Sequence, residues 1–463
     1  MKQTLKPLIW LYVFLLIGEG ALRKWILPGL SDALLIVRDP VLLLIYVEAI
    51  RQGVVRWNHF MTTFVVMATL AVGLSLANGQ DNLAIVAYGL RTNFLHFPLI
   101  WVMAETLDRR DVDYLGIAVL GAAVLMTPLM VRQFSSAPDA YVNRGVGLAG
   151  GENLQIFGAD GRIRPPGFFA FITGPQLFFP LAAAFLFGQL TAVRRRLPWP
   201  LLTLAAVCIA IALPVSISRS TVVGTMVVGA CFLFTLSHLT GSIVSRIGVL
   251  LRIGLVLGVL SAALSRLPVF SQAVDVFLMR WLDTGSDNSG WTDIVLRSLE
   301  QYTNIAGYVA EAPSLGHGIG MGSNVAARLL YGAPDIVLAE EEWGKNILEL
   351  GPLLGLAYIG LRFTLVFYCA AKALTALRHE QNPLPLLILA ACALAVTQGQ
   401  LGPPTVLGFA VIGPGLLLAA LKTDAPADGP ATPTAPTAAP PTVAGADPRI
   451  PAASDRRPPA NLR

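Results

Sequence analysis

Charged side chains are scarce in this chain. Asp, Glu, Lys and Arg make up only 13% of its 463 residues, whereas 55% are hydrophobic, and the mean hydropathy is +0.65. A soluble domain carries roughly 25% charged residues. The composition therefore excludes an ordinary soluble globular protein and indicates a polytopic integral membrane protein.

Cysteine is equally scarce. The four cysteines lie within apolar runs and form no CxxC pair (Cys208, Cys231, Cys369 and Cys392). This pattern argues against both disulfides and zinc, and we expect no metal and no cofactor. The net charge of +5 comes from basic residues dispersed in short loops, which does not indicate a nucleic-acid partner.

The first apolar run resembles a leader peptide at its start but lacks a convincing cleavage site. Lys2 and Lys6 precede an apolar run, but Glu19, Arg23 and Lys24 interrupt it and no small-residue cleavage site follows. We interpret this run as a retained first span.

The apolar runs predict an all-α membrane domain over residues 1–422. A window of about 20 apolar residues per span gives about twelve transmembrane helices. Their expected limits are 7–27, 33–50, 60–77, 83–105, 112–133, 165–190, 198–215, 220–237, 247–265, 346–370, 384–402 and 404–421. From Thr423 on, the last 41 residues hold 10 Pro and 11 Ala, which predicts a disordered cytoplasmic tail over 423–463.

The distribution of Lys and Arg predicts the orientation. Basic residues recur in alternate loops and at both ends of the membrane domain (Lys2, Lys6, Arg51, Arg56, Arg109, Arg110, Arg194, Arg195, Arg196, Arg246, Arg252, Lys372, Arg378 and Lys422). Because basic loops stay in the cytoplasm, we expect both termini there. The longer segments 134–164 and 266–345 then face outside. Apolar residues near helical spacing predict a short amphipathic helix over 291–311 in the second loop (Ile294, Val295, Leu299, Tyr302, Ile305 and Val309).

Three arginines lie where a membrane protein can least easily hold a charge. Arg164 opens the run Arg164-Pro-Pro-Gly-Phe-Phe, Arg219 lies between two hydrophobic segments, and Arg91 lies deeper within its span. A guanidinium at membrane depth costs at least a few kcal/mol and binds phosphate oxygens bidentately. We therefore interpret all three as candidate pyrophosphate ligands. The structural alternative is snorkelling or local pairing at a span end for Arg164 and Arg219, and a buried acidic partner for Arg91.

Candidate bases lie in the second long loop. Glu342 ends the triplet Glu340–Glu342, and His317 lies in Gly316-His-Gly-Ile-Gly-Met-Gly322. A carboxylate or imidazole there could deprotonate an acceptor hydroxyl. The alternatives are a solvated acidic loop and glycines that serve tight turns. Arg38 is another charge beside an expected span, and its neighbour Asp39 offers a simple structural explanation for that charge.

Several short motifs, in their order along the chain, resemble one family. Arg164-Pro-Pro-Gly resembles the Arg-x-x-Gly after the shorter periplasmic loop of the O-antigen ligase and O-antigen polymerase (Wzy-like) superfamily. Ser216-Ile-Ser-Arg-Ser220 resembles its Ser-x-Ser-Arg segment, and Gly316–Gly320 its glycine-rich loop. Glu349-Leu-Gly-Pro-Leu-Leu-Gly355 resembles its Glu-x-Gly-x-x-Gly segment. About a dozen helices with one long late loop also fit, over residues 80–420.

The resemblance implies a glycosyltransferase of the bacterial inner membrane. It would polymerise or ligate undecaprenyl-pyrophosphate-linked oligosaccharide repeats at the periplasmic face, in O-antigen or exopolysaccharide biosynthesis, without metal or cofactor. Its partners would be this donor, a glycan or lipid-linked acceptor, membrane lipids and other polysaccharide-assembly proteins. Arg164 and Arg219 would hold the pyrophosphate. Family ligases place a histidine before the span that follows the loop, whereas this chain reads Glu340-Glu-Glu-Trp-Gly-Lys-Asn346, which favours a polymerase with Glu342 as base and His317 as competitor.

Two non-enzymatic interpretations stay open. A lipid-linked glycan flippase or other polysaccharide transporter would need a charged cavity across the membrane, whereas an enzyme needs its arginines and base at one leaflet. The second non-enzymatic interpretation is a scaffolding subunit of a polysaccharide export complex.

Overall fold

The computed structural model describes residues 4–147, 153–154, 156–192, 195–239, 243–282, 299–332 and 338–422. These described residues form one compact unit. The tail expected over 423–463 lies outside the described residues, as do Ile294 and Val295 of the expected amphipathic helix.

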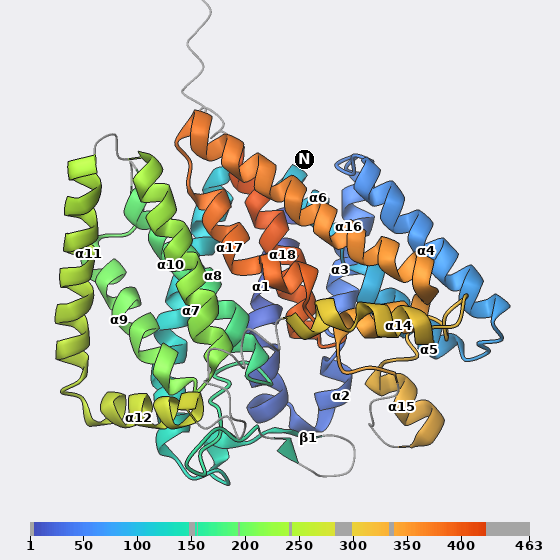
Figure 1. Cartoon of the computed structure of the whole chain (residues 1–463), viewed down its shortest axis with the longest axis horizontal. Helices are drawn as coiled ribbons and strands as arrows, with labels where there is room; N and C mark the ends of the chain where they lie inside the picture. The colour runs from blue at the N-terminus through green and yellow to red at the C-terminus, as the bar shows by residue number, and fades with distance from the viewer. Residues whose placement is uncertain are drawn as a thin grey trace, which may run out of the picture. The chain divides into compact units, whose positions relative to one another are not determined.

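The described chain is helical (Figure 1). Its first part comprises α1 (Leu5–Ala21), the π-turn η1 (Leu22–Ile26), η2 (Pro28–Leu30), α2 (Ser31–Leu34), α3 (Arg38–Arg51), α4 (His59–Ala77), α5 (Leu83–Leu90), the π-turn η3 (Arg91–Leu95), α6 (Leu99–Thr106) and α7 (Arg109–Ser135). The middle comprises η4 (Tyr141–Asn143), β1 (Val146–Gly147), β2 (Asn153–Leu154), α8 (Thr173–Thr191), α9 (Trp199–Val215), α10 (Arg219–Leu239), α11 (Ile243–Leu264) and α12 (Pro268–Leu282). The last part comprises α14 (Ile305–Glu311), α15 (Asn324–Tyr331), α16 (Glu342–Glu380), α17 (Leu384–Thr397) and α18 (Pro404–Ala420). The two short strands pair antiparallel, with Val146 opposite Leu154.

Each of the twelve expected segments contains a helix, but twelve membrane spans are not confirmed. Among the described residues, six helices are long and apolar enough to cross a membrane, or seven if one bent pair counts as a span. The six are Leu5–Ile26, His59–Ala77, Leu83–Thr106, Arg109–Ser135, Arg219–Leu239 and Glu342–Glu380.

Length explains most of the difference from the expected twelve. The helices α3 and α17 have 14 residues, and α9 and α18 have 17. At 1.5 Å per residue they cover about 21–26 Å, less than the hydrocarbon core of about 30 Å. The bent pair, Gly258–Leu264 and Pro268–Leu282, turns by 106°: α11 covers the ninth expected span, and α12 is a helix within the expected loop 266–345.

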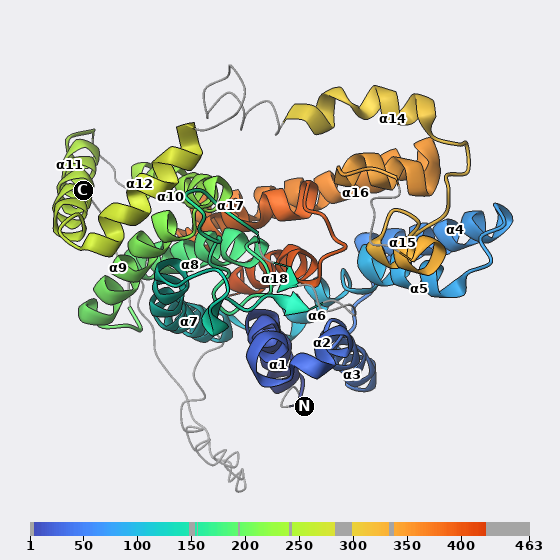
Figure 2. The same cartoon turned by 90° about the horizontal axis from the view of Figure 1, so that it is seen from below.

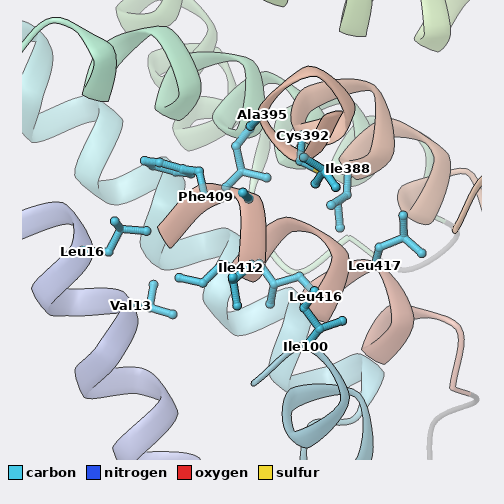
Figure 3. Close-up of a cluster of buried hydrophobic side chains, with 14 of the residues drawn as sticks. Val13, Leu16, Ile100, Ile388, Cys392, Ala395, Phe409, Ile412, Leu416 and Leu417 are labelled. Atoms are coloured by element: carbon cyan, nitrogen blue, oxygen red, sulfur yellow. The ribbon is translucent and has the colours of Figure 1, made fainter. Parts of the chain in front are cut away.

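The helix α18 lies at the centre of the hydrophobic core. Figure 3 shows Phe409, Ile412 and Leu416 of α18 among side chains from α1, α6 and α17. Nearly every residue of α18 is buried, as expected for a helix that is apolar on all sides.

One end of α7 gathers the basic loops, and we call it the basic end. Asp108 caps α7 there in a reciprocal capping box with Asp111. Lys6 Nζ lies 3.1 Å from Asp108 and 2.6 Å from Asp111, and Lys422 Nζ donates to the Leu107 carbonyl at 3.1 Å. Both ends of the described membrane unit therefore lie at the same end of α7. Which side of the membrane this is stays a prediction.

Two more expected basic loops reach the basic end. Arg196 Nε lies 2.8 Å from Asp113, and Arg56 Nε lies 4.0 Å from Glu105.

Burial works against the charged carboxylate of Asp108, but hydrogen bonds from the Asp111 backbone and from Lys6 lower its pKa overall.

The opposite end of α7 carries the first long loop, and we call it the loop end. Arg162 Nη1 donates to the Phe134 carbonyl at 2.6 Å, near the last turn of α7. Because α7 has 27 residues, about 40 Å separates its two ends. In Figure 1 the N-terminus lies at the top, and β1 and α12 lie near the bottom.

The helix α16 is two arms, 342–350 and 352–380, joined at Gly351. Gly351 has φ +80° and ψ 164°, and Pro352 follows it. Proline has no N–H and clashes with the preceding turn, so the helix breaks here. Glu342 and Arg362 would lie about 30 Å apart in a straight helix, yet their side chains are 2.9 Å apart. The chain therefore folds back at Gly351, inside the expected span 346–370.

The described part of the expected amphipathic helix covers α16. Ile305, Tyr308 and Val309 pack on a buried cluster of Trp343, Ile347 and Ile359. Figure 2 shows α14 lying alongside α16. Tyr302 meets Trp343 edge to face with ring centroids 4.6 Å apart, whereas Leu299 is exposed.

Candidate functional site at the loop end

Buried polar side chains hold the turn that carries Arg164. Lys24 Nζ donates to the Gly167 carbonyl at 2.8 Å, and Gln133 Oε1 accepts from the Gly167 N–H at 2.9 Å. Position 167 requires glycine, because its φ is +60° and a Cβ there would lie 2.6 Å from the Met126 side chain. The same turn explains why α8 begins at Thr173 rather than near 165.

A short hairpin places Arg164 near the α9–α10 turn. The Arg164 N–H donates to the Ile156 carbonyl at 2.9 Å, and the Gly158 N–H to the Arg162 carbonyl at 2.7 Å. A Cβ on Gly158 would lie 3.0 Å from Ile217 Cγ2. The hairpin 156–164 therefore packs on the turn that precedes Arg219.

Arg280 connects this hairpin to Arg219. Arg280 Nη1 donates to the Gly158 carbonyl at 3.2 Å, and Arg219 Nη2 donates to the Arg280 carbonyl at 2.6 Å. The backbone of Arg164, both the side chain and the carbonyl of Arg280, and the side chain of Arg219 thus belong to one series of contacts at the loop end. We call these three residues the arginine cluster. Sequence reasoning missed Arg280, since only the bend between α11 and α12 brings it here.

The turn before Arg219 is strained. Ile217 is fully buried with φ +47°, a left-handed conformation that is unfavourable for a β-branched residue. Such outliers cost about 1–3 kcal/mol and are concentrated at functional sites. The turn leaves Ser218 Oγ to accept from the Thr221 N–H at 3.4 Å and from Gln176 Nε2 at 3.1 Å, and it presents Arg219 as the first residue of α10.

The arginine cluster suits an anion. The N-terminus of the 21-residue α10 adds partial positive charge to that of the arginines. Within the described part of the chain, the buried Nε of Arg164 has no hydrogen-bond acceptor. Phosphate oxygens are the acceptors that a guanidinium fork fits best.

Arg91 is not part of the arginine cluster. Its Nε and Nη2 both bond to the Asp39 carboxylate, with Nη2 at 3.2 Å from Oδ1. His96 Nε2 lies 3.2 Å from the same carboxylate, and His96 Nδ1 shares a hydrogen bond of 2.7 Å with Tyr12. The contacts of Arg91 are therefore those of a buried structural pair between α3 and η3.

Asp39 does not neutralise its neighbour Arg38, contrary to the simple explanation from sequence. Arg38 Nε lies 3.6 Å from Glu19, Arg23 Nη1 lies 3.2 Å from Glu19, and Arg38 Nη2 donates to the Pro404 carbonyl. The side chains of Glu19, Arg23 and Arg38 are at least nine-tenths buried. The reason is helical geometry, because residues 38 and 39 point in different directions at the start of α3.

Glu342 is held in a buried ion pair. It is 1% exposed, and its Oε1 accepts from Arg362 Nη1 at 2.9 Å. Its Oε2 accepts from the Leu401 N–H at 3.3 Å and lies 3.5 Å from Lys345 Nζ. Sequence reasoning missed Arg362, although a lone arginine in the apolar run after Pro352 was a usable signal.

Arg362 also fixes the end of α17. It is 0% exposed, and its Nε and Nη2 donate to the carbonyls of Val396 and Gly399 at 2.6 and 2.8 Å. These carbonyls lie at the C-terminal end of α17, where helical donors are missing. The pair therefore joins the two arms of α16 to α17.

The glycine-rich stretch 316–322 closes the break in α16. The Leu348 carbonyl would normally accept from residue 352, but Pro352 has no N–H. It accepts from the His317 N–H at 2.8 Å instead, and the Glu349 carbonyl accepts from the Gly318 N–H at 3.0 Å. Glu349 Oε1 accepts from the Gly322 N–H at 2.8 Å.

Positive φ values in this stretch confirm the prediction of tight turns. Gly316, Gly318 and Gly320 have φ of +72°, +102° and +84°. The backbone of the stretch is anchored on α4 and the turn after it, with the Ile319 N–H bonded to Ser75 at 2.8 Å and Asn78 Nδ2 to the Gly316 carbonyl at 2.6 Å. The side chain of His317 is exposed.

The structure thus divides the five site residues predicted from sequence. Arg164 and Arg219 share the loop end, Arg91 pairs with Asp39, Glu342 pairs with Arg362, and His317 is exposed on the glycine-rich stretch. Among the described contacts none joins His317 or Glu342 to the arginine cluster. Within the same residues no group of three or more His, Cys, Asp or Glu side chains is placed to hold a metal ion.

Comparison with known proteins adds no family assignment. No protein-family model matches the chain, and no curated protein matches it.

Proposed function

We propose that this protein is a membrane-embedded glycosyltransferase that polymerises undecaprenyl-pyrophosphate-linked oligosaccharide repeats. The single observation that carries the proposal is the arginine cluster at one end of the helical unit, with strained Ile217 and the start of α10 beside it. The order of the short motifs along the chain also supports it. On this proposal the loop end faces the periplasm of a bacterial inner membrane.

The arginine cluster would bind the donor pyrophosphate. Arg164 and Arg219 would neutralise the negative charge that grows on the leaving pyrophosphate as the glycosidic bond breaks. Lys24 and Gln133 would position Arg164 through Gly167. Catalysis would then come mainly from positioning and charge stabilisation.

We expect Arg164→Lys and Arg219→Lys each to lower polymer yield by about tenfold or more, since an ammonium cannot form the bidentate contact. The measurement is glycan length and lipid-linked repeats in strains that carry each variant, at matched protein levels. Single lipid-linked repeats should accumulate. Arg132→Lys, an exposed position in the last turn of α7, is the matched control.

The outcomes of this experiment separate the functions. Long polymer that stays unattached to its acceptor would indicate a ligase, and repeats trapped in the cytoplasmic leaflet would indicate a flippase. Normal polymer length and yield in both Lys variants would rule out the pyrophosphate clamp.

His317 is the better base of the two candidates. Glu342 has its carboxylate oxygens engaged by Arg362, Lys345 and the Leu401 N–H, so it lacks access to an acceptor. His317 is exposed and its backbone is anchored. The reaction therefore requires that the acceptor hydroxyl at His317 lies within reach of the anomeric carbon of a donor whose pyrophosphate is bound by the arginine cluster.

We expect His317→Ala to lower polymerisation by about a hundredfold, as loss of a general base does, with normal protein levels because the side chain is exposed. The measurement is the polymerisation rate with purified lipid-linked repeats. Wild-type rates in His317→Ala, together with an inactive but folded Glu342→Gln, would return the role to Glu342.

One observation favours a flippase as second candidate. The ion pairs Glu19–Arg23, Glu19–Arg38 and Asp39–Arg91 lie buried in or beside candidate spans, and intramembrane charges often mark transport pathways. Each of these arginines contacts a carboxylate, with two carboxylates shared among three arginines, and this internal pairing makes the enzyme the stronger proposal.

A further inference from the structure

A pocket of about 800 Å³ lies at the basic end, away from the arginine cluster. Three parts of the chain form it: the first turns of α7 with Arg109 and Asp113, the end of α8 with residues 188–189, 191–192 and 195–196, and the turn 380–384 between α16 and α17. Arg109 begins α7, and the hairpin that carries Arg164 packs at the other end of that helix, about 40 Å away.

Arginines dominate the polar side of this pocket. Arg109, Arg195 and Arg196 line it, together with the carboxylates of Asp113 and Glu380. Arg196 is neutralised by Asp113 at 2.8 Å. Arg109 and Arg195 make no ion pair with any described residue, so the pocket keeps an excess of positive charge.

Part of the pocket lining is apolar. Ile117, Phe185 and Leu384 form this part, and the last two are almost fully buried, at 3% and 5% exposure. A pocket for a small hydrophilic anion has no need of such a floor. A charged rim over an apolar floor fits a molecule with a phosphate and a hydrocarbon part.

Aromatic side chains place the pocket at the level of a membrane surface. Trp199 is 57% exposed and lies 4.1 Å from the Arg195 guanidinium, and Tyr114 lines the pocket at 42% exposure. Trp and Tyr are enriched where the membrane meets water. The phosphates of lipid headgroups lie at this level.

We propose that this pocket binds the phosphate of an anionic glycerophospholipid from the adjacent leaflet. Arg109 and Arg195 contact the phosphate oxygens, and Ile117, Phe185 and Leu384 receive the first part of an acyl chain. Basic pockets between membrane helices bind anionic headgroups in this way. The site is independent of the proposed glycosyltransferase activity, and the lipid joins α7, α8 and the α16–α17 turn.

The test uses the full-length protein in nanodiscs of phosphatidylglycerol or phosphatidylcholine, followed by release into detergent and counting of retained lipids by native mass spectrometry. The wild type should retain phosphatidylglycerol. The double variant Arg109→Gln/Arg195→Gln should retain it about tenfold less, since two arginine contacts are lost. The control Arg51→Gln/Arg378→Gln removes two exposed arginines that do not line the pocket and should match the wild type.

Three outcomes would overturn the proposal. Equal retention of the two lipids by the wild type shows that the headgroup charge is not recognised. Equal loss in the control variant shows that any two positive charges suffice. Full displacement of phosphatidylglycerol by millimolar inorganic phosphate, with phosphate binding that depends on Arg109 and Arg195, shows that the ligand is a free phosphate instead.

Discussion

Replacing Arg362 with alanine is expected to destabilise the protein by about 3–5 kcal/mol, because it leaves the carboxylate of Glu342 buried without its main partner. Both side chains are at most 1% exposed, and Arg362 also donates to the Val396 and Gly399 carbonyls. The remaining cation, Lys345, lies 3.5 Å from Glu342 and compensates only in part. The measurement is the unfolding of purified protein in detergent, followed by its tryptophan fluorescence, to which the buried Trp343 contributes.

A double variant separates the ion pair from the packing. Arg362→Met/Glu342→Met removes both charges together, and buried pairs replaced by apolar side chains are often close to neutral in stability. We therefore expect the double variant to be more stable than Arg362→Ala. Arg378→Ala, at an exposed position in the second arm of α16, is the control. Unfolding of Arg362→Ala at the same temperature as Arg378→Ala would show that the pair contributes nothing.

Gly320→Ala is expected to cost about 2–5 kcal/mol, as the sum of left-handed backbone strain and overpacking. Gly320 has φ +84°, and a Cβ there would collide with the Ile85 carbonyl and lie 3.0 Å from the Gly89 N. These neighbours are backbone atoms of α5, so no side chain can rotate away. The same unfolding assay measures the loss, and polymer yield should fall because the stretch also carries His317.

A second glycine isolates the steric part of this effect. Gly332 has φ +73°, and a Cβ added to it would meet no described atom within 4 Å. Gly332→Ala should therefore show only the backbone strain, about 1–2 kcal/mol. If Gly320→Ala and Gly332→Ala lose the same stability, the close contact with α5 does not matter and the stretch is held less tightly than its hydrogen bonds indicate.

Local composition predicted the class of this protein well. Each of the twelve expected apolar segments contains a helix, and the expected basic loops around Arg56, Arg109 and Arg196 meet at the basic end with Lys6 and Lys422. Hydrophobic length and loop charge act within a few turns of chain, so they can be read from sequence. The exact number of spans could not be predicted from the sequence, because helices such as α17 and α18 are only 14 and 17 residues long.

Breaks in helices were predictable only in part. The expected span 346–370 runs through Pro352 without a break, although proline was a usable signal for one. The reversal that brings Glu342 to Arg362 depends also on Gly351 and on the glycine-rich stretch that satisfies the freed carbonyls. The turn at Pro165 and Pro166 likewise shortens the sixth expected helix, whose first residue is Thr173. Averaging hydropathy over a window does not detect the reversal or the turn, because both segments remain apolar.

By itself the sequence determined that the chain is helical, with apolar helices that could cross a membrane and with charges in unusual places, because burial of apolar side chains and the cost of a charge in lipid depend on residue type. Only the tertiary structure decided what those charges do. It pairs Arg91 with Asp39 and Glu342 with Arg362, and it gathers Arg164, Arg219 and Arg280 at the loop end. An ion pair needs two atoms within about 4 Å of each other, and residues far apart in sequence reach that distance only through the packing of the whole helical unit.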